Sequence, residues 1–338
     1  MNGFGSMLRD YLEYYRISQS DFADRLGITQ KHMNEIINGK TKISPELMVL
    51  ISLLTNIDIS LIVYAEKKKE TYDTLMSKYK TEKEINKMLK TYYLKEMSEK
   101  KWIKLKYPES FVQNYLDLVE YLGVNETSSI NTYLNKRYLF KKADENVNNL
   151  KIYLWIRHCD LKTKDIKIDE YNSNKLNDLL TELKKERLKK FNKTTLIKLF
   201  HKYGIILYIE DALQGTKVRG CIKVMINTPV IYMTTYLKEK SSFYYTLYHG
   251  LMHLKKDYNK LKSKTIVEED SSEDEMNKLA LNEMINEDIY KKILNDYGNK
   301  EIIAKENKIP LCFLYTRLAM EGKISYKSKE YLNNLERI

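Results

Sequence analysis

The segment from Gln19 to Asn38 constrains the fold of this chain more than any other part of the sequence. Ala23 is small where two helices must cross closely, and Gly27 follows at a turn where a left-handed backbone favours glycine. Thr29 is placed to cap the helix that comes next. Apolar positions for a three-helix core recur on both sides of this turn, at Phe22, Leu26, Ile28, Met33 and Ile36. The segment therefore predicts two short helices joined by a tight turn.

The second of these helices separates an inward face from a polar face. Met33, Ile36 and Ile37 are spaced to point inward, and the other side carries Gln30, Lys31, Asn34 and Asn38. Gln and Asn can pair with adenine, and Lys with guanine, at base edges in a DNA major groove. An ordinary helical hairpin with a polar outer face is the alternative. Gln19, Lys40 and Lys42 are placed to contact phosphates. The full candidate DNA-binding set is Gln19, Thr29, Gln30, Lys31, Asn34, Asn38, Lys40 and Lys42.

Residues 6–75 resemble the Cro/C1-type (XRE) helix-turn-helix family. The stretch Asn34-Glu-Ile-Ile-Asn-Gly-Lys40, followed by Ser44-Pro-Glu46, is similar in particular to antitoxins of the HigA type. The resemblance implies a five-helix, lambda-repressor-like DNA-binding domain over residues 1–70 that binds operator DNA as a homodimer. Residues 1–65 carry a net charge of −1. We therefore expect weak non-specific DNA binding from this segment alone, because neutralisation of phosphates normally drives it.

Few turn signals interrupt the rest of the chain. It holds 11 Gly and 4 Pro among 338 residues, which favours a mainly α fold with a small β-sheet. Residues 71–150 are predicted to form a helical connector, because Tyr72, Leu75 and Tyr79 begin an apolar stripe at helical spacing. Three β-rich runs, 205–209, 221–226 and 230–234, predict the sheet. We expect helices over 6–16, 19–26, 30–38, 45–55, 60–69, 111–122, 128–139, 145–158, 174–185, 194–202, 241–255 and 272–294.

Composition and charge exclude several classes of protein. Three separated cysteines without a C-x-x-C pair argue against a disulfide framework and fit a reducing cytoplasm. Arg9 and Asp10 stand where a signal peptide needs an apolar core. The best membrane candidate, 47–65, contains Asn56 and Asp58 and is better explained as two short core helices. We therefore expect a cytoplasmic protein without a membrane partner.

The positive charge of the chain is concentrated in its middle. The net charge is +12, and residues 176–265 alone carry +11. Such a segment can attract nucleic acid or an acidic protein. The alternative is a general abundance of surface lysine, of the kind that an AT-rich genome produces.

Two of the five histidines, His249 and His253, are four residues apart on a predicted helix. This spacing puts both imidazoles on one helix face, as a zinc site requires. Two exposed helix histidines without a metal are the alternative. His158 and His201 stand apart from other ligand types, and we expect both to be structural. Candidates for a third ligand on the following helix are Glu273, Asp274 and Glu275.

From about Trp155 onward the chain resembles the ImmA/IrrE metallopeptidase domain, an α+β zincin-like fold. The segments that carry the resemblance are Asp211–Gly220, Phe243-Tyr-Tyr-Thr-Leu-Tyr-His249 and Asp274-Glu-Met-Asn-Lys-Leu-Ala280. The resemblance implies a peptidase-like domain over 151–297 and a C-terminal helical segment over 298–338. It also implies one zinc ion, held by His249, His253 and Glu275.

The chain departs from this family at one position. The family's general base is the glutamate directly after the first histidine, and here that position is Gly250. Glycine cannot accept the proton of a zinc-bound water. Glu239 and Asp257 are carboxylates that the fold could bring close. We expect a domain without catalytic residues, which either binds zinc without hydrolysis or has lost the metal as well.

Together, these features predict a transcriptional repressor from a toxin–antitoxin module or from a mobile element such as a prophage. Its partners would be double-stranded operator DNA and a protein, namely an inducer, an antirepressor or a toxin. Two alternatives remain. One is a HigA-type antitoxin that neutralises a toxin, and the other is an active zinc peptidase that cleaves a repressor.

Overall fold

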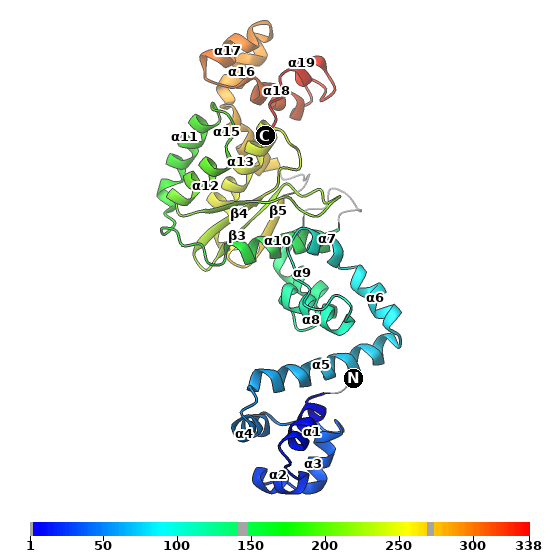
Figure 1. Cartoon of the computed structure of the whole chain (residues 1–338). Helices are drawn as coiled ribbons and strands as arrows, with labels where there is room; N and C mark the ends of the chain where they lie inside the picture. Colours follow the sequence, from blue (N-terminus) through cyan, green and yellow to red (C-terminus); the bar gives the residue numbers. More distant parts are fainter. Residues whose placement is uncertain (1–2, 141–147, 269–273) are drawn as a thin grey trace. The chain divides into compact units, whose positions relative to one another are not determined.

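The computed structural model describes residues 3–140, 148–268 and 274–338 (Figure 1). The chain divides into two compact units, Met1–Asn125 and Glu126–Ile338. No helix in the described part of the chain has the length and apolar character needed to cross a bilayer.

The first unit begins with five helices around a small apolar core. They are α1 (Phe4–Tyr14), α2 (Gln19–Leu26), α3 (Gln30–Ile37), α4 (Pro45–Thr55) and α5 (Ile59–Tyr79). The core contains Phe22, Met33 and Ile36, as the sequence predicts. Ser18, Thr29 and Ser44 cap α2, α3 and α4, because each hydroxyl accepts a hydrogen bond from a backbone N–H three residues later. Gly27 ends α2 with a φ of +68°. The expected tight turn between α2 and α3 is therefore present.

Helix α5 extends beyond the expected 60–69 and connects the five-helix core to the rest of the first unit. It runs to Tyr79 and is followed by α6 (Glu82–Lys90), α7 (Leu94–Glu99) and α8 (Phe111–Leu122). Tyr64 on α5 forms a hydrogen bond with Gln113, a buried residue of α8. The helices of the N-terminal core and the following helical segment are thus joined through one continuous helix.

A close approach in this core, which no pattern in the sequence indicated, lies between α1 and α3. A Cβ atom on Gly5 would lie 2.3 Å from the carbonyl oxygen of Ile36 and 2.6 Å from that of Ile37. Both atoms belong to the backbone, so a rotamer change cannot relieve the overlap. Glycine at position 5 is what allows α1 to pack this closely on α3.

The second unit contains a five-stranded sheet in the order β1-β5-β3-β4-β2. The strands are β1 (Tyr138–Phe140), β2 (Ile206–Ile209), β3 (Gly220–Met225), β4 (Thr228–Met233) and β5 (Thr265–Glu268). β3 pairs antiparallel with β4 and β5, whereas β1 with β5 and β2 with β4 are parallel pairs. β2, β3 and β4 confirm the three expected runs. β1 and β5 were not expected, and β1 takes residues 138–139 from the predicted helix 128–139.

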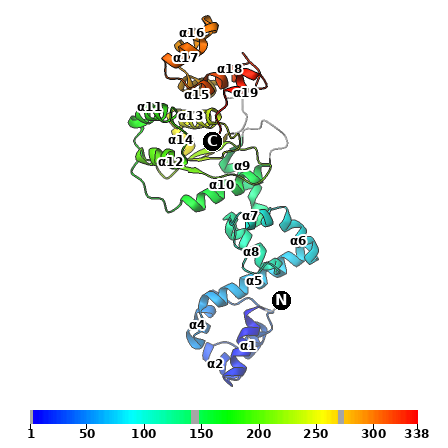
Figure 2. The same ribbon diagram turned by 45° about the horizontal axis from the view of Figure 1, so that its top comes forward.

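Helices cover both faces of this sheet (Figures 1 and 2). On one face, α13 (Lys240–Lys256) packs on Ile222 and Ile231 within the main core. On the other face lies α10 (Asn149–Thr163). Its Asp160 accepts a hydrogen bond from Tyr232 of β4 at 2.7 Å and forms an ion pair with Lys223 of β3.

The remaining helices of the second unit are mostly short. They are α9 (Ile130–Arg137), α11 (Leu176–Glu186), α12 (Lys193–Lys202), α14 (Tyr258–Leu261), α15 (Asp274–Met284), α16 (Glu287–Asn295), α17 (Lys300–Glu306), α18 (Leu311–Met320) and α19 (Lys329–Asn333). The single helix predicted over 272–294 is wrong, because Asn286 caps a new helix through its side chain. Positions 145–147 and 272–273 of the predicted helices lie outside the described residues.

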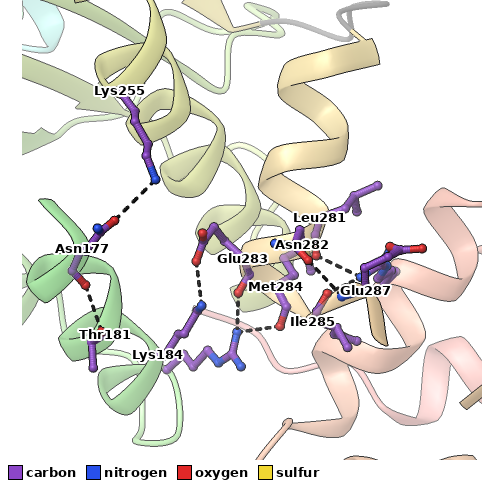
Figure 3. A network of polar contacts seen from close by, with 12 residues as sticks. Asn177, Thr181, Lys184, Lys255, Leu281, Asn282, Glu283, Met284, Ile285 and Glu287 are labelled. Carbon is purple, nitrogen blue, oxygen red and sulfur yellow. Dashed lines mark hydrogen bonds and ion pairs between the residues drawn. The ribbon is translucent and has the colours of Figure 1, made fainter. Parts of the chain in front are cut away.

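Two buried arginines hold the C-terminal end of α15, where Leu281, Met284 and Ile285 are labelled in Figure 3. Arg187 donates to the carbonyl oxygen of Met284 at 2.7 Å, and Arg317 donates to those of Leu281 and Ile285. The last carbonyls of a helix have no partner within the helix, and a positive charge there is favourable. These contacts tie the end of α15, the helix on which the sequence predicts the third zinc ligand, to the end of α11 and to α18.

Replacing Gly5 with alanine tests the close approach of α1 and α3. We expect Gly5→Ala to destabilise the first unit by at least about 2 kcal/mol, because the added Cβ overlaps backbone atoms. Hydrogen exchange of α1 and α3 in the full chain measures the loss of protection. Gly298→Ala is the matched control, since an added Cβ there meets nothing within 4 Å. Equal protection in both variants would contradict the assigned contact.

Candidate nucleic-acid interface and histidine pair

The polar face of α3 is exposed, as the sequence analysis expects. Thr29 caps the helix by accepting a hydrogen bond from the backbone N–H of His32 at 3.2 Å. The opposite face of α3 is buried in the core through Met33, Ile36 and Ile37. All eight residues of the candidate set are exposed: Gln19, Thr29, Gln30, Lys31, Asn34, Asn38, Lys40 and Lys42. Their side chains are therefore accessible to a ligand as large as a DNA duplex.

The side-chain amide of Asn38 is already engaged, and its Nδ2 also donates a hydrogen bond to the side-chain oxygen of Asn34. α3 ends at Ile37, so Asn38 is the cap residue and not part of the helix. Its Nδ2 donates to the carbonyl oxygen of Asn34 at 2.8 Å, and its Oδ1 accepts from Arg9 of α1 at 3.0 Å. Asn38 therefore orients Asn34 and ties α3 to α1. Arg9 brings a positive charge to this edge that no local sequence signal indicated.

Lys42 forms an ion pair with an acidic residue of α5. Its Nζ lies 2.7 Å from Oε1 of Glu70, and Lys67 contacts the other oxygen of Glu70 at 3.1 Å. Hydrogen bonds to Lys42 and Lys67 lower the pKa of Glu70, so the carboxylate stays charged. Exposed pairs of this kind contribute little to stability. An anion could therefore displace Glu70 from Lys42 at small cost, but Glu70 lowers the positive charge of this surface.

Neutralising Glu70 tests this competition. We expect Glu70→Gln to strengthen DNA binding a few-fold, because Lys42 is released. The slope of log K against log salt concentration should also steepen by the equivalent of about one phosphate contact. Asp73→Asn is the matched control: it removes the same charge from α5 but pairs with Lys69 and not with Lys42. Fluorescence anisotropy across a salt series measures both quantities. An equal change in the two variants would assign the effect to net charge and not to Lys42.

The second candidate site is the histidine pair on α13. The Nε2 atoms of His249 and His253 lie 3.0 Å apart, and Nδ1 of His253 lies 2.8 Å from Oδ2 of Asp257. The two histidines are 2% and 1% exposed. A carboxylate on the outer nitrogen of a histidine is a common support for a metal ligand. It also fits a buried hydrogen-bonded chain in which His249 donates to His253 and His253 donates to Asp257.

The expected third ligand does not join this pair. The side chain of Glu275 is 73% exposed, and its Oε1 lies 3.8 Å from Nζ of Lys256. Asp274 is exposed as well, and Glu273 lies outside the described residues. Over 3–140, 148–268 and 274–338, no three His, Cys, Asp or Glu side chains gather closely enough to hold a metal ion. The structure thus brings together two of the three expected ligands, and zinc binding stays a prediction.

The other histidines and carboxylates singled out in the sequence lie in ordinary surroundings. His158 is buried in α10, and His201 is half-buried on α12, where burial lowers its pKa. Glu239 accepts hydrogen bonds from Ser242 and Tyr331, both at 2.9 Å. Of the two carboxylates that the fold could bring close, Asp257 therefore contacts the histidine pair, whereas Glu239 is bound elsewhere.

Gly250 faces the apolar side of the sheet. A Cβ atom on this residue would lie 4.0 Å from Cδ1 of Ile222 and 4.0 Å from Cδ1 of Ile231, which is ordinary contact distance. A methyl group therefore fits at this position. A longer acidic side chain would start among isoleucines, where a charge is costly. Position 250 is thus an apolar packing position in this chain.

Two substitutions of Gly250 test this environment. We expect Gly250→Ala to raise the free energy of unfolding by about 0.5–1 kcal/mol, because alanine is the better helix former and its methyl group has room. We expect Gly250→Glu to lower it by at least about 2 kcal/mol, because a carboxylate enters an apolar site. Urea denaturation of the full chain measures both. A Gly250→Glu chain as stable as the unmodified one would show that position 250 opens to solvent.

The comparisons with known proteins bear on the first of the two sites. Residues 8–62 match a family model described as Helix-turn-helix. The match covers most of α1, all of α2 to α4 and the start of α5, so these helices are a helix-turn-helix of the kind found in DNA-binding regulators. A search of curated proteins and a search of solved structures each found no match.

Proposed function

We propose that this chain is a transcriptional repressor that binds operator DNA as a homodimer through α2 and α3. The observation that carries the proposal is the helix-turn-helix match over residues 8–62, together with the exposed polar face of α3. A recognition helix places its N-terminal residues against base edges. In α3 those residues are Gln30, Lys31 and Asn34, whose side chains suit adenine and guanine.

The charge of residues 1–65 supports binding by two copies. Residues 1–65 carry a net charge of −1, so a single helix-turn-helix gains little from phosphate neutralisation. Helix-turn-helix dimers bind two half-sites about one helical turn apart, which adds the contacts of both copies. The affinity of the proposed repressor would then come from base contacts made twice.

We propose that the second unit binds a protein partner and catalyses no reaction. Gly250 in the place of the general base supports this, and so does its position against Ile222 and Ile231. The partner would be an inducer, an antirepressor or a toxin, in a cytoplasmic regulatory system of a mobile element or a toxin–antitoxin module. These assignments follow the family resemblances of the sequence. No step of the proposal depends on a bound metal.

Replacing Gln30, Lys31 and Asn34 together with alanine tests the proposed function. We expect binding to DNA from the region upstream of the gene to weaken at least about 100-fold, because each lost base contact costs about 1–3 kcal/mol. Anisotropy or gel shift with that DNA measures the change. The control replaces three exposed residues of the same types in the second unit, Gln214, Lys291 and Asn295. Unchanged binding by the α3 variant would overturn the recognition-helix assignment.

A further inference from the structure

Helix α4 carries apolar side chains on both of its sides. Between Pro45 and Thr55 its one charged residue is Glu46, at the N-terminal end. Leu47 and Ile51 are buried in the core. The other side consists of Val49, Leu50, Leu53 and Leu54, which are 45%, 44%, 71% and 47% exposed. We call these four residues the α4 face. A helix that is apolar all round is normally buried on all sides.

The placement of the α4 face leaves the candidate DNA interface accessible. Its residues follow each other at i, i+1, i+4 and i+5, so they share one side of the helix. Within the first unit, α4 and α3 lie on different sides of the helical core (Figure 1). A protein that covers the α4 face can therefore bind at the same time as DNA on α3.

We propose that the α4 face binds the α4 face of a second copy of this chain in a two-fold symmetric dimer. This inference rests on the proposed function, which requires two copies on one operator. A two-fold interface is made by the same patch on both copies, so the patch must be complementary to itself. Four aliphatic side chains without a charge meet that condition. Residues 1–65, which carry the α4 face, have a net charge of −1 and add little local repulsion between the two faces.

The area of the α4 face predicts the strength of the dimer. Four half-exposed aliphatic side chains present on the order of 400 Å², or about 800 Å² for the two copies, against about 1,200–2,000 Å² in a stable interface. The face alone therefore supports a weak dimer that forms at micromolar concentration. On an operator the two copies lie side by side, and the same contact then appears as cooperative DNA binding.

A charge placed in the centre of the α4 face tests the proposal in the full chain. In sedimentation velocity we expect the unmodified chain to shift from monomer to dimer between roughly 1 and 100 µM. We expect Leu53→Glu to remain a monomer throughout, because two carboxylates would face each other across the two-fold axis. Leu332→Glu is the matched control, because Leu332 is 53% exposed on α19 of the other unit. Val49→Lys serves as a second variant, and circular dichroism verifies that each variant is folded.

The outcomes separate this interface from the proposed function. The interface is supported if Leu53→Glu and Val49→Lys abolish dimerisation and Leu332→Glu preserves it. This holds whether or not the chain binds the upstream DNA. Failure of a dimerising chain to bind that DNA overturns the proposed function alone. A wild-type chain that stays monomeric up to 100 µM, or a Leu53→Glu chain that dimerises equally well, overturns the α4 face as the interface. With the upstream DNA, Leu53→Glu is expected to lose cooperativity and to keep non-specific binding.

Discussion

The second unit depends on the burial of α13 along almost its entire length. Residues 240–254 of this helix are all buried, between the sheet on one side and α15 and α18 on the other. Buried polar groups must find partners within the protein. Tyr245 donates to Asn277 at 2.8 Å, and Ser241 shares a hydrogen bond with Thr316 at 2.7 Å. The contacts of His249, His253 and Asp257 belong to the same set. This helix holds the unit together through its polar side chains as well as its apolar ones.

The burial of α13 also limits what the histidine pair can do. Hydrolysis at a metal needs an open coordination position, a nearby base and a path for substrate. In the described structure the two imidazoles are almost fully covered, position 250 faces isoleucines, and Glu275 points to Lys256. Among the described residues, the covered imidazoles leave no open path for substrate, and position 250 supplies no base. The proposal of a binding unit without catalysis therefore draws on the burial of the histidine pair as well as on the missing glutamate.

The local features of this fold could be predicted from the sequence, and the long-range ones could not. The capping of α3 by Thr29 and the turn at Gly27 each depend on residues within a few positions, so their signals are complete in a short window. The pairs Arg9–Asn38 and Lys42–Glu70 join residues 29 and 28 positions apart. The clash that Gly5 avoids comes from the backbone of α3. Short edge strands such as β1 have too few residues to show a period of two.

The same distinction explains the outcome at the proposed zinc site. The i, i+4 spacing of His249 and His253 fixes their geometry through one helix, and the structure brings the two rings together as expected. Glu275 sits on another helix, so its approach depends on where α15 begins and how it is rotated. The buried arginines Arg187 and Arg317 fix the far end of α15, and no sequence pattern indicated them.

In the proposed regulation, the second unit controls DNA binding by the first unit through the concentration of free chains. A dimer with a small apolar interface dissociates at low micromolar concentration, so operator occupancy depends on more than the first power of the free chain concentration. A protein that binds the second unit and removes chains from this pool would lower occupancy steeply. Such regulation needs neither peptidase activity nor a conformational signal between the units. A non-catalytic second unit is therefore sufficient for a regulated repressor.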